Sequence, residues 1–146
     1  MAITQAIANA FKKQLLEGDA NFSSSSGDKF KLALYTSSAT LNSSTTAFTT
    51  SGEVSNTGTY ASGGGALAGQ NTSIASGVAI VDFADLSFTG VTLTARGAMI
   101  YNTSSAVTNA AVAILDFGAD KTATSGTFTI QFPAFTTAAA ILRISG

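Results

Sequence analysis

Four aspartates are the residues whose type and spacing most suggest chemistry in this chain. They fall in two similar runs, each a short apolar segment that ends in Asp-Phe with a second Asp close behind. The acids are Asp82, Asp85, Asp116 and Asp120. Such runs predict two strands of one sheet that leave the core at similar points, where carboxylates could meet as oxygen ligands for calcium.

The alternative interpretation of the same acids is a set of solvated, turn-forming strand ends. Asp82 and Asp116 would then pair with basic side chains, for which Lys121 and Arg96 are the candidates. EF-hand spacing is absent from the sequence, and spacing alone supplies no set of six to eight ligands. We therefore expect no bound metal and no cofactor, and keep the four acids as the weak candidates.

Composition narrows the possible chemistry further. The chain has no cysteine and no histidine, which removes thiolate nucleophiles, imidazole bases and zinc sites of the Cys/His kind. No Gly-x-Ser-x-Gly elbow occurs, and Gly63 to Gly65 is not followed by the Gly-Lys-Ser/Thr of a phosphate loop. We expect a protein that is not an enzyme and has no small-molecule substrate.

The charge pattern points to protein partners. Only 10% of the 146 residues are charged, against about 25% in an ordinary domain, and seven basic residues nearly balance eight acidic ones. Nucleic acid binding would need clustered Lys and Arg, and no apolar run is long enough to span a bilayer. A sparsely charged surface rich in Ser and Thr suits packing against other protein, so we expect neither nucleic acid nor membrane as a partner.

A single amphipathic helix is predicted at about residues 3–17. Apolar residues recur there every four positions, and Gly18 stands where a helix ends with a left-handed residue. The apolar positions are Ile3, Ile7, Phe11 and Leu15. The helix either packs on the domain's own sheet or serves as an arm that docks on a neighbouring subunit.

The rest of the chain reads as β-structure. Residues 29–36 alternate as a strand with one buried face, and residues 37–77 form a long Ser/Thr/Gly-rich loop region with short strands near 52–55 and 66–74. From residue 78 to 145 a β-meander is predicted. Its strands are Val78–Phe88, Val91–Asn102, Val107–Phe117, Gly126–Phe132 and Ala138–Ser145. The expected fold is one domain over residues 1–146, mainly β, an antiparallel β-sandwich or barrel that is jelly-roll-like, with the N-terminal helix.

Arg96 precedes a glycine inside a strand pattern. Gly97 predicts a β-bulge, because glycine inside a strand weakens the ladder. Arg96 is a candidate interface anchor, since arginine is frequent in binding hot spots, or else an outward charge that discourages sheet-to-sheet aggregation.

Several segments resemble a known group of proteins. They are Met1–Ile7 with Phe11-Lys12 and Leu15-Leu16, Phe30–Leu41, Ala95–Ala98 and Val112–Lys121. Together they look like a family of small structural (virion) proteins encoded among the structural genes of tailed bacteriophages. The resemblance implies a capsid cement or decoration protein that binds the outer surface of the major capsid lattice and stabilises it.

The resemblance also implies a location and partners. The protein would assemble in the host cytoplasm into the virion, with the major capsid protein as partner and with itself as a homodimer or homotrimer. Its contacts would come from Ile3, Ile7, Phe11, Leu15 and Arg96, together with the hydroxyl-rich loop from Ser43 to Gly65. A tail, neck or fibre-associated component is the first alternative, and a carbohydrate-binding host-recognition module is the second.

Overall fold

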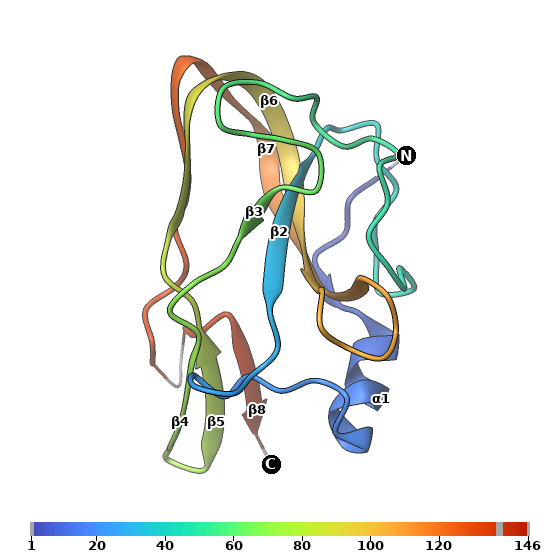
Figure 1. Cartoon of the computed structure of the whole chain (residues 1–146), viewed down its shortest axis with the longest axis vertical. Coiled ribbons are helices and arrows are strands. Elements are labelled where there is room, and N and C mark those ends of the chain that lie inside the picture. Colours follow the sequence, from blue (N-terminus) through green and yellow to red (C-terminus); the bar gives the residue numbers. More distant parts are fainter. Residues whose placement is uncertain (1, 137–138, 146) are drawn as a thin grey trace.

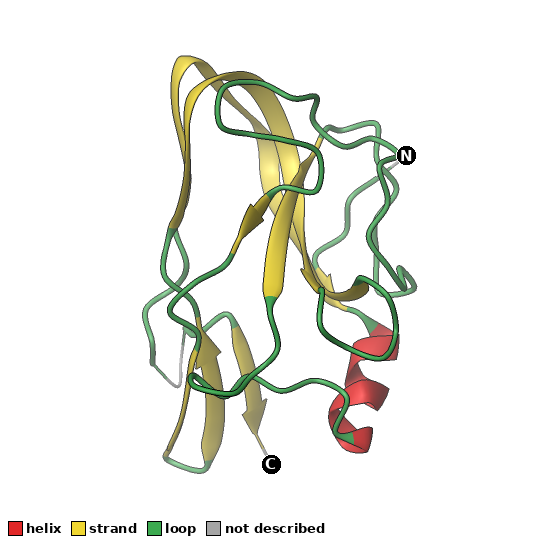
Figure 2. Ribbon diagram, viewed as in Figure 1, coloured by secondary structure: helices red, strands yellow, loops and turns green. Residues whose placement is uncertain are grey.

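Antiparallel sheets make up most of the structure, a computed structural model that describes residues 2–136 and 139–145. The elements are β1 (Ala6–Ile7), α1 (Asn9–Glu17), β2 (Phe30–Tyr35), β3 (Gly65–Ala66), β4 (Asn71–Ala75), β5 (Val78–Asp82), β6 (Leu86–Asn102), β7 (Ala110–Ile130) and β8 (Leu142–Ser145). The strands form a five-stranded sheet in the order β1-β7-β6-β2-β3 and a three-stranded sheet in the order β4-β5-β8 (Figures 1 and 2). This confirms the predicted mainly-β class with one short helix near the N-terminus. Among the described residues, no helix is long and apolar enough to span a membrane.

The β6–β7 hairpin is the largest element of the fold. Its strands are 17 and 21 residues long, and Figure 1 shows them bending together at one end of the molecule. Strict alternation near one end puts Val91 and Leu93 in the core, while Thr92 and Thr94 face solvent. Register shifts interrupt the pairing at several points, one of them between Ala95 and Gly97. The irregularity therefore adjoins Gly97 as predicted, but its extra residues lie in β7, because Arg96 alone stands opposite residues 117–120, where Gly118 has φ 80°. Such bulges bend a strand pair and increase its twist.

The predicted strands of the second half differ from the observed ones in three ways. Residues 107–117 and 126–132 are predicted as separate strands, but β7 runs unbroken from 110 to 130 because β6 supplies a partner along its length. Residues 78–88 are predicted as one strand, but β5 ends at Asp82 and β6 begins at Leu86 in the other sheet. The last predicted strand is shorter, as β8 starts at Leu142, and Ala138 lies outside the described residues.

The two Asp-Phe runs do not lie side by side. β5 belongs to the small sheet, between β4 and β8, whereas the run ending at Asp116 is part of β7 in the large sheet. The prediction of a continuous meander over residues 78–145 is therefore wrong, because β8 returns to pair with β5 instead of with β7. The sequence of a short apolar run does not show which of the two sheets the run belongs to, because either sheet can bury such a run in the same way.

The N-terminal segment is only partly helical. α1 begins at Asn9, after Ala8 in an extended conformation (φ −61°, ψ 134°), and the segment before it is extended. Ile3 forms a bridge with Leu41, and β1 pairs with β7. The predicted start near residue 3 is wrong because sheet edges offer the first residues backbone partners. The end is confirmed: Gly18 has φ 78° and caps the helix.

The long loop region is held against the large sheet. β3 and β4 lie in the region predicted to contain short strands, while residues 52–55 contribute only an isolated bridge between Glu53 and Tyr35. Because this region covers β2, both faces of β2 are largely buried, and the prediction of one exposed face is wrong.

Aromatic side chains fill the core between the sheets. Phe22 stacks on Phe30 with ring centroids 4.5 Å apart, and Phe83 packs edge-on to both. Phe11 of α1 packs edge-on against Phe22 at 5.9 Å. Phe83, the Phe residue of the first Asp-Phe pair, is thus a core residue at the end of β5 whose ring packs on Phe30 of β2, on Phe22 and on Phe132.

Candidate functional site

The four candidate acids do not converge. Asp82 ends β5, and the Asp85 carboxylate accepts a hydrogen bond from the Phe132 backbone N–H at 2.8 Å. Asp116 and Asp120 both lie within β7. Among the described residues, no group of three or more acids is placed to hold a metal ion. The expectation that these strands bring carboxylates together is wrong, because they occupy different sheets.

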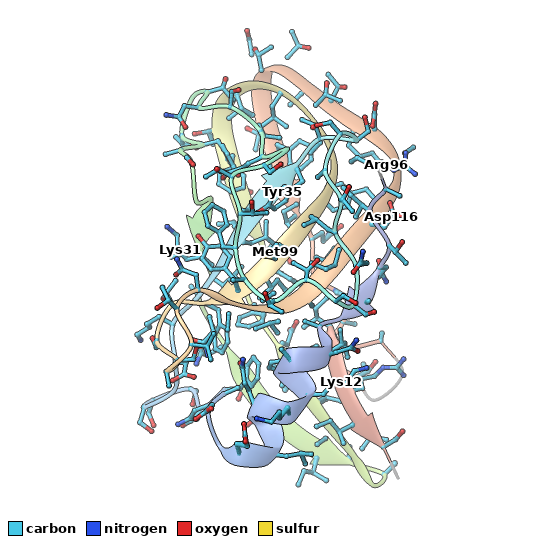
Figure 3. The ribbon with its side chains drawn as sticks, turned by 90° about the vertical axis from the view of Figure 1, so that its right-hand side faces the viewer. Lys12, Lys31, Tyr35, Arg96, Met99 and Asp116 are labelled. Carbon is cyan, nitrogen blue, oxygen red and sulfur yellow. The ribbon has the colours of Figure 1, made fainter. Side chains whose placement is uncertain are left out.

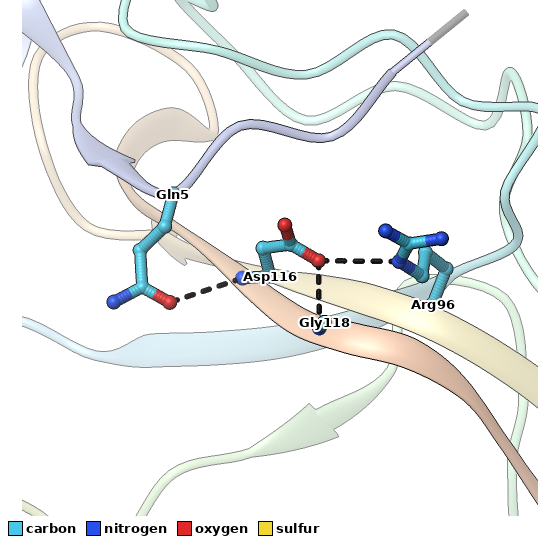
Figure 4. Close-up of polar contacts among 4 residues, drawn as sticks. All are labelled: Gln5, Arg96, Asp116 and Gly118. Atoms are coloured by element: carbon cyan, nitrogen blue, oxygen red, sulfur yellow. Dashed lines mark hydrogen bonds and ion pairs between the residues drawn. The ribbon is translucent and has the colours of Figure 1, made fainter.

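Asp116 instead takes part in a polar cluster at the β-bulge (Figures 3 and 4). Its Oδ1 lies 3.3 Å from Arg96 Nε, as the alternative interpretation of the acids predicts, and accepts the Gly118 N–H at 2.9 Å. The Asp116 backbone N–H donates to Gln5 Oε1 at 3.2 Å. The Gly118 N–H and the Arg96 guanidinium lower the pKa of the Asp116 carboxyl.

This cluster has a structural consequence. A Cβ at Gly97 would meet the Leu115 carbonyl oxygen and would lie 2.9 Å from Ile3 Cγ2, so only glycine leaves room for Ile3 there. Gln5 and Ile3 thereby fasten the N-terminal segment across the hairpin at the bulge. Arg96 is half-exposed and already paired, so its proposed role as an interface anchor stays a prediction.

A second network orders the hydroxyl-rich loop from Ser43 to Gly65. The Tyr60 hydroxyl accepts the Leu34 N–H at 2.9 Å and donates to Glu53 Oε2 at 2.8 Å. The Glu53 carboxylate also accepts the Ser62 hydroxyl and the Gly63 N–H. Burial, and then the Glu53 charge, raise the pKa of Tyr101 to about 12. This loop segment is thus fixed on β2 and β6 by buried tyrosines.

An open groove with a volume of about 810 Å³ lies between α1 and the three-stranded sheet. Figure 3 shows α1 lying in front of that sheet, with Lys12 on the helix. The groove is lined by Ile7, Phe11, Lys12, Leu15, Phe22, Thr72, Ser73, Ile74, Ala79, Ile80, Val81, Leu142, Arg143, Ile144 and Ser145. Most of these side chains are apolar, and the charged ones are cationic. We call this feature the α1 groove.

Three predicted interface residues contribute to the α1 groove, but mainly as its walls. Phe11 is buried, and Ile7 and Leu15 pack against the core. Ile3 is buried under the hairpin and does not line the groove. The helix therefore packs on its own domain, and in this conformation these side chains present little surface to a neighbour.

Sequence reasoning missed the exposed part of the groove. Ile74 of β4 is 79% exposed and Ile144 of β8 is 61% exposed, although both are large and apolar. A signal was present in the sequence, because each lies in a short strand whose neighbours are small or polar. Isolated exposed apolar residues are ordinary, and only their convergence on one groove gives these two meaning.

A shallower hollow of about 530 Å³ follows the outer part of β7. Its lining includes Gln5, Asp116, Phe117 and Phe128, so it adjoins the polar cluster at the bulge.

Searches of protein-family models, of curated proteins and of solved structures find nothing that matches this chain.

Proposed function

We propose that this chain is a structural protein of a tailed-phage virion, a cement or decoration protein that binds the outer surface of the major capsid lattice. The phage assignment is supported by the resemblance of four segments to small virion proteins. The α1 groove carries the rest of the proposal: it is an apolar surface with exposed Ile74 and Ile144 on a molecule with few charges.

The chemistry of the groove describes the surface that would fit it. Its charged lining residues are Lys12 and Arg143, with no acidic residue among the lining residues. A capsid segment with apolar side chains and a carboxylate would complement such a groove. Each copy would contribute a modest contact, and repetition over the lattice would raise the total affinity.

A binding experiment tests this proposal. Capsids purified from the phage that encodes the chain, emptied of DNA and stripped of this protein, are mixed with the purified protein and sedimented. We expect the protein to sediment with the capsids and to raise the temperature at which they break. Absence of co-sedimentation at saturating concentration would contradict the capsid role.

Matched variants locate the contact. Ile144→Glu places a negative charge at an exposed position of the groove and is expected to weaken capsid binding. Val107→Glu is the control, because Val107 is an exposed apolar residue (46%) that does not line the groove. Equal loss of binding in both variants would remove the groove from the proposal.

Two other assignments are outcomes of separate measurements. Immunoelectron microscopy of virions that labels tails instead of shells would move the protein to the tail or neck. A carbohydrate-binding role is less favoured, because sugar rings stack on exposed aromatic rings and all three tyrosines are buried. Binding on a glycan array would support that role against the present proposal.

A further inference from the structure

The outer edge of β4 has none of the usual protection of an edge strand. β4 lies at one side of the three-stranded sheet, with β5 between it and β8 (Figure 1). All five of its residues, Asn71 to Ala75, are exposed. They include no charge and no proline, and no register shift interrupts the pairing with β5. Natural edge strands are normally blunted by such features, because an open edge pairs with other chains.

The hairpin turn determines which backbone groups the edge offers. Ser76 and Gly77 join β4 to β5 with φ values of 51° and 75°, the signs of a type I′ turn. The flanking pair Ala75–Val78 is then hydrogen-bonded, and such pairs alternate along an antiparallel ladder. Thr72 and Ile74 therefore direct their N–H and C=O groups away from β5. Consistently, the Thr72 N–H donates to a side-chain oxygen, Asn71 Oδ1, at 2.9 Å.

We propose that β4 pairs antiparallel with β4 of a second copy of this chain, across a two-fold axis at Ser73. Thr72 of one copy then lies opposite Ile74 of the other, and the two three-stranded sheets become one continuous sheet. The two edges can form backbone hydrogen bonds only in registers that place residues with outward-facing N–H and C=O groups opposite each other. Among these registers, the one centred on Ser73 pairs the whole of β4. The exposed Ile74 side chain gains the facing Thr72 methyl group as a neighbour.

A second copy fits this edge better than an unrelated strand for an electrostatic reason. In the two-fold pairing each β4 edge meets an identical edge, so a charged edge strand would meet charges of its own sign, and this edge has none. Asp82, the acid opposite Asn71, lies at the end of the hairpin away from the turn. Antiparallel pairing puts that end beside the turn of the partner, so the two Asp82 carboxylates stay apart.

Single cysteines test the register, because the chain has no cysteine of its own. In the proposed dimer the two Ser73 residues form a non-hydrogen-bonded pair, with Cα atoms about 4.5 Å apart, within reach of a disulfide. Ala75→Cys is the matched control on the same exposed strand, because its two copies lie about 13 Å apart. Under mild oxidation, Ser73→Cys is expected to give a disulfide-linked dimer and Ala75→Cys to stay unlinked.

Charge substitutions test the surface. Ile74→Lys is expected to weaken dimerisation, measured by sedimentation equilibrium, by at least about tenfold. Ile144→Lys is the control, because it places the same charge on an exposed residue of β8, at the other edge of the sheet. Circular dichroism checks that both variants fold.

The outcomes separate clearly. A wild-type dimer, with selective cross-linking in Ser73→Cys and selective loss in Ile74→Lys, supports the proposal. A protein that is monomeric at every concentration, equal cross-linking in both cysteine variants, or equal weakening in both lysine variants overturns it. These measurements need no capsid, so the pairing of β4 stands or fails independently of the proposed virion role.

Discussion

The Asp116 carboxylate joins two strands of the hairpin at the point where the N-terminal segment crosses them. Its pKa is lowered in the folded state by the Gly118 N–H and by Arg96, so its contribution to stability is present above the ordinary carboxyl pKa. That contribution is lost as the pH falls through the folded-state pKa. Acid is therefore expected to weaken the link between Asp116 of β7 and Arg96 of β6, beside the point where Gln5 contacts the Asp116 backbone.

An Asp116→Asn variant tests the direction of this dependence of stability on pH. Asparagine keeps an oxygen for the Gly118 N–H but loses the charge that faces Arg96. At neutral pH the wild type is expected to have the higher melting temperature, and the difference is expected to shrink as the pH falls below about 4. Asp120→Asn, a change of the same kind on the same strand, is the control. A melting difference that stays constant between acid and neutral pH would contradict the assignment.

At the scale of elements, the β6–β7 hairpin depends on two glycines to different degrees. A Cβ at Gly97 would collide with the Leu115 carbonyl and with Ile3, whereas a Cβ at Gly126 would have its nearest contact at 3.4 Å. Gly97→Ala is therefore expected to lower the free energy of unfolding by about 1–3 kcal/mol, since backbone or Ile3 must move. Gly126→Ala is expected to change it by less than about 0.5 kcal/mol. Urea denaturation measures both, and equal effects would show that the bulge tolerates a side chain.

The predicted elements succeed where the signal is local. Gly18 ends the helix, Gly97 adjoins a register shift of the hairpin, and threonines alternate with apolar residues along β6, because each depends on residues close in sequence. The start of α1 could not be predicted in the same way. The spacing of Ile3 and Ile7 fits a helix, but Leu41 and β7 provide strand partners that the sequence does not announce.

In the candidate site, too, features set by nearby residues could be predicted and features set by distant contacts could not. The pairing of Asp116 with Arg96 could be predicted as one alternative, since both residues lie in strand-like patterns. The supposed cluster with Asp82 required knowledge of which strands share a sheet, which depends on contacts between distant residues. The α1 groove could not be predicted, because it forms only where a helix and a separate small sheet face each other.

At the scale of the whole molecule, the two proposed interfaces differ in charge. The β4 edge is uncharged, so the dissociation constant of the dimer is expected to change by less than about threefold between low and high salt. The α1 groove has cationic lining residues, so capsid binding is expected to weaken as salt rises. Sedimentation at several salt concentrations measures both. A dimer that dissociates in high salt would indicate that charged residues away from β4 hold it together.

The pairing of β8 with β5 also sets the order in which the protein can complete its fold. The β4–β5 hairpin has a local turn and can form early, but the open side of β5 must wait for Leu142–Ser145, which are synthesised only after both long strands of the large sheet. During that interval the hairpin exposes two unpaired edges instead of one. Within the small sheet, β8 is therefore the last strand to become available, and only its docking leaves the β4 edge as the one open edge of the β4–β5 hairpin.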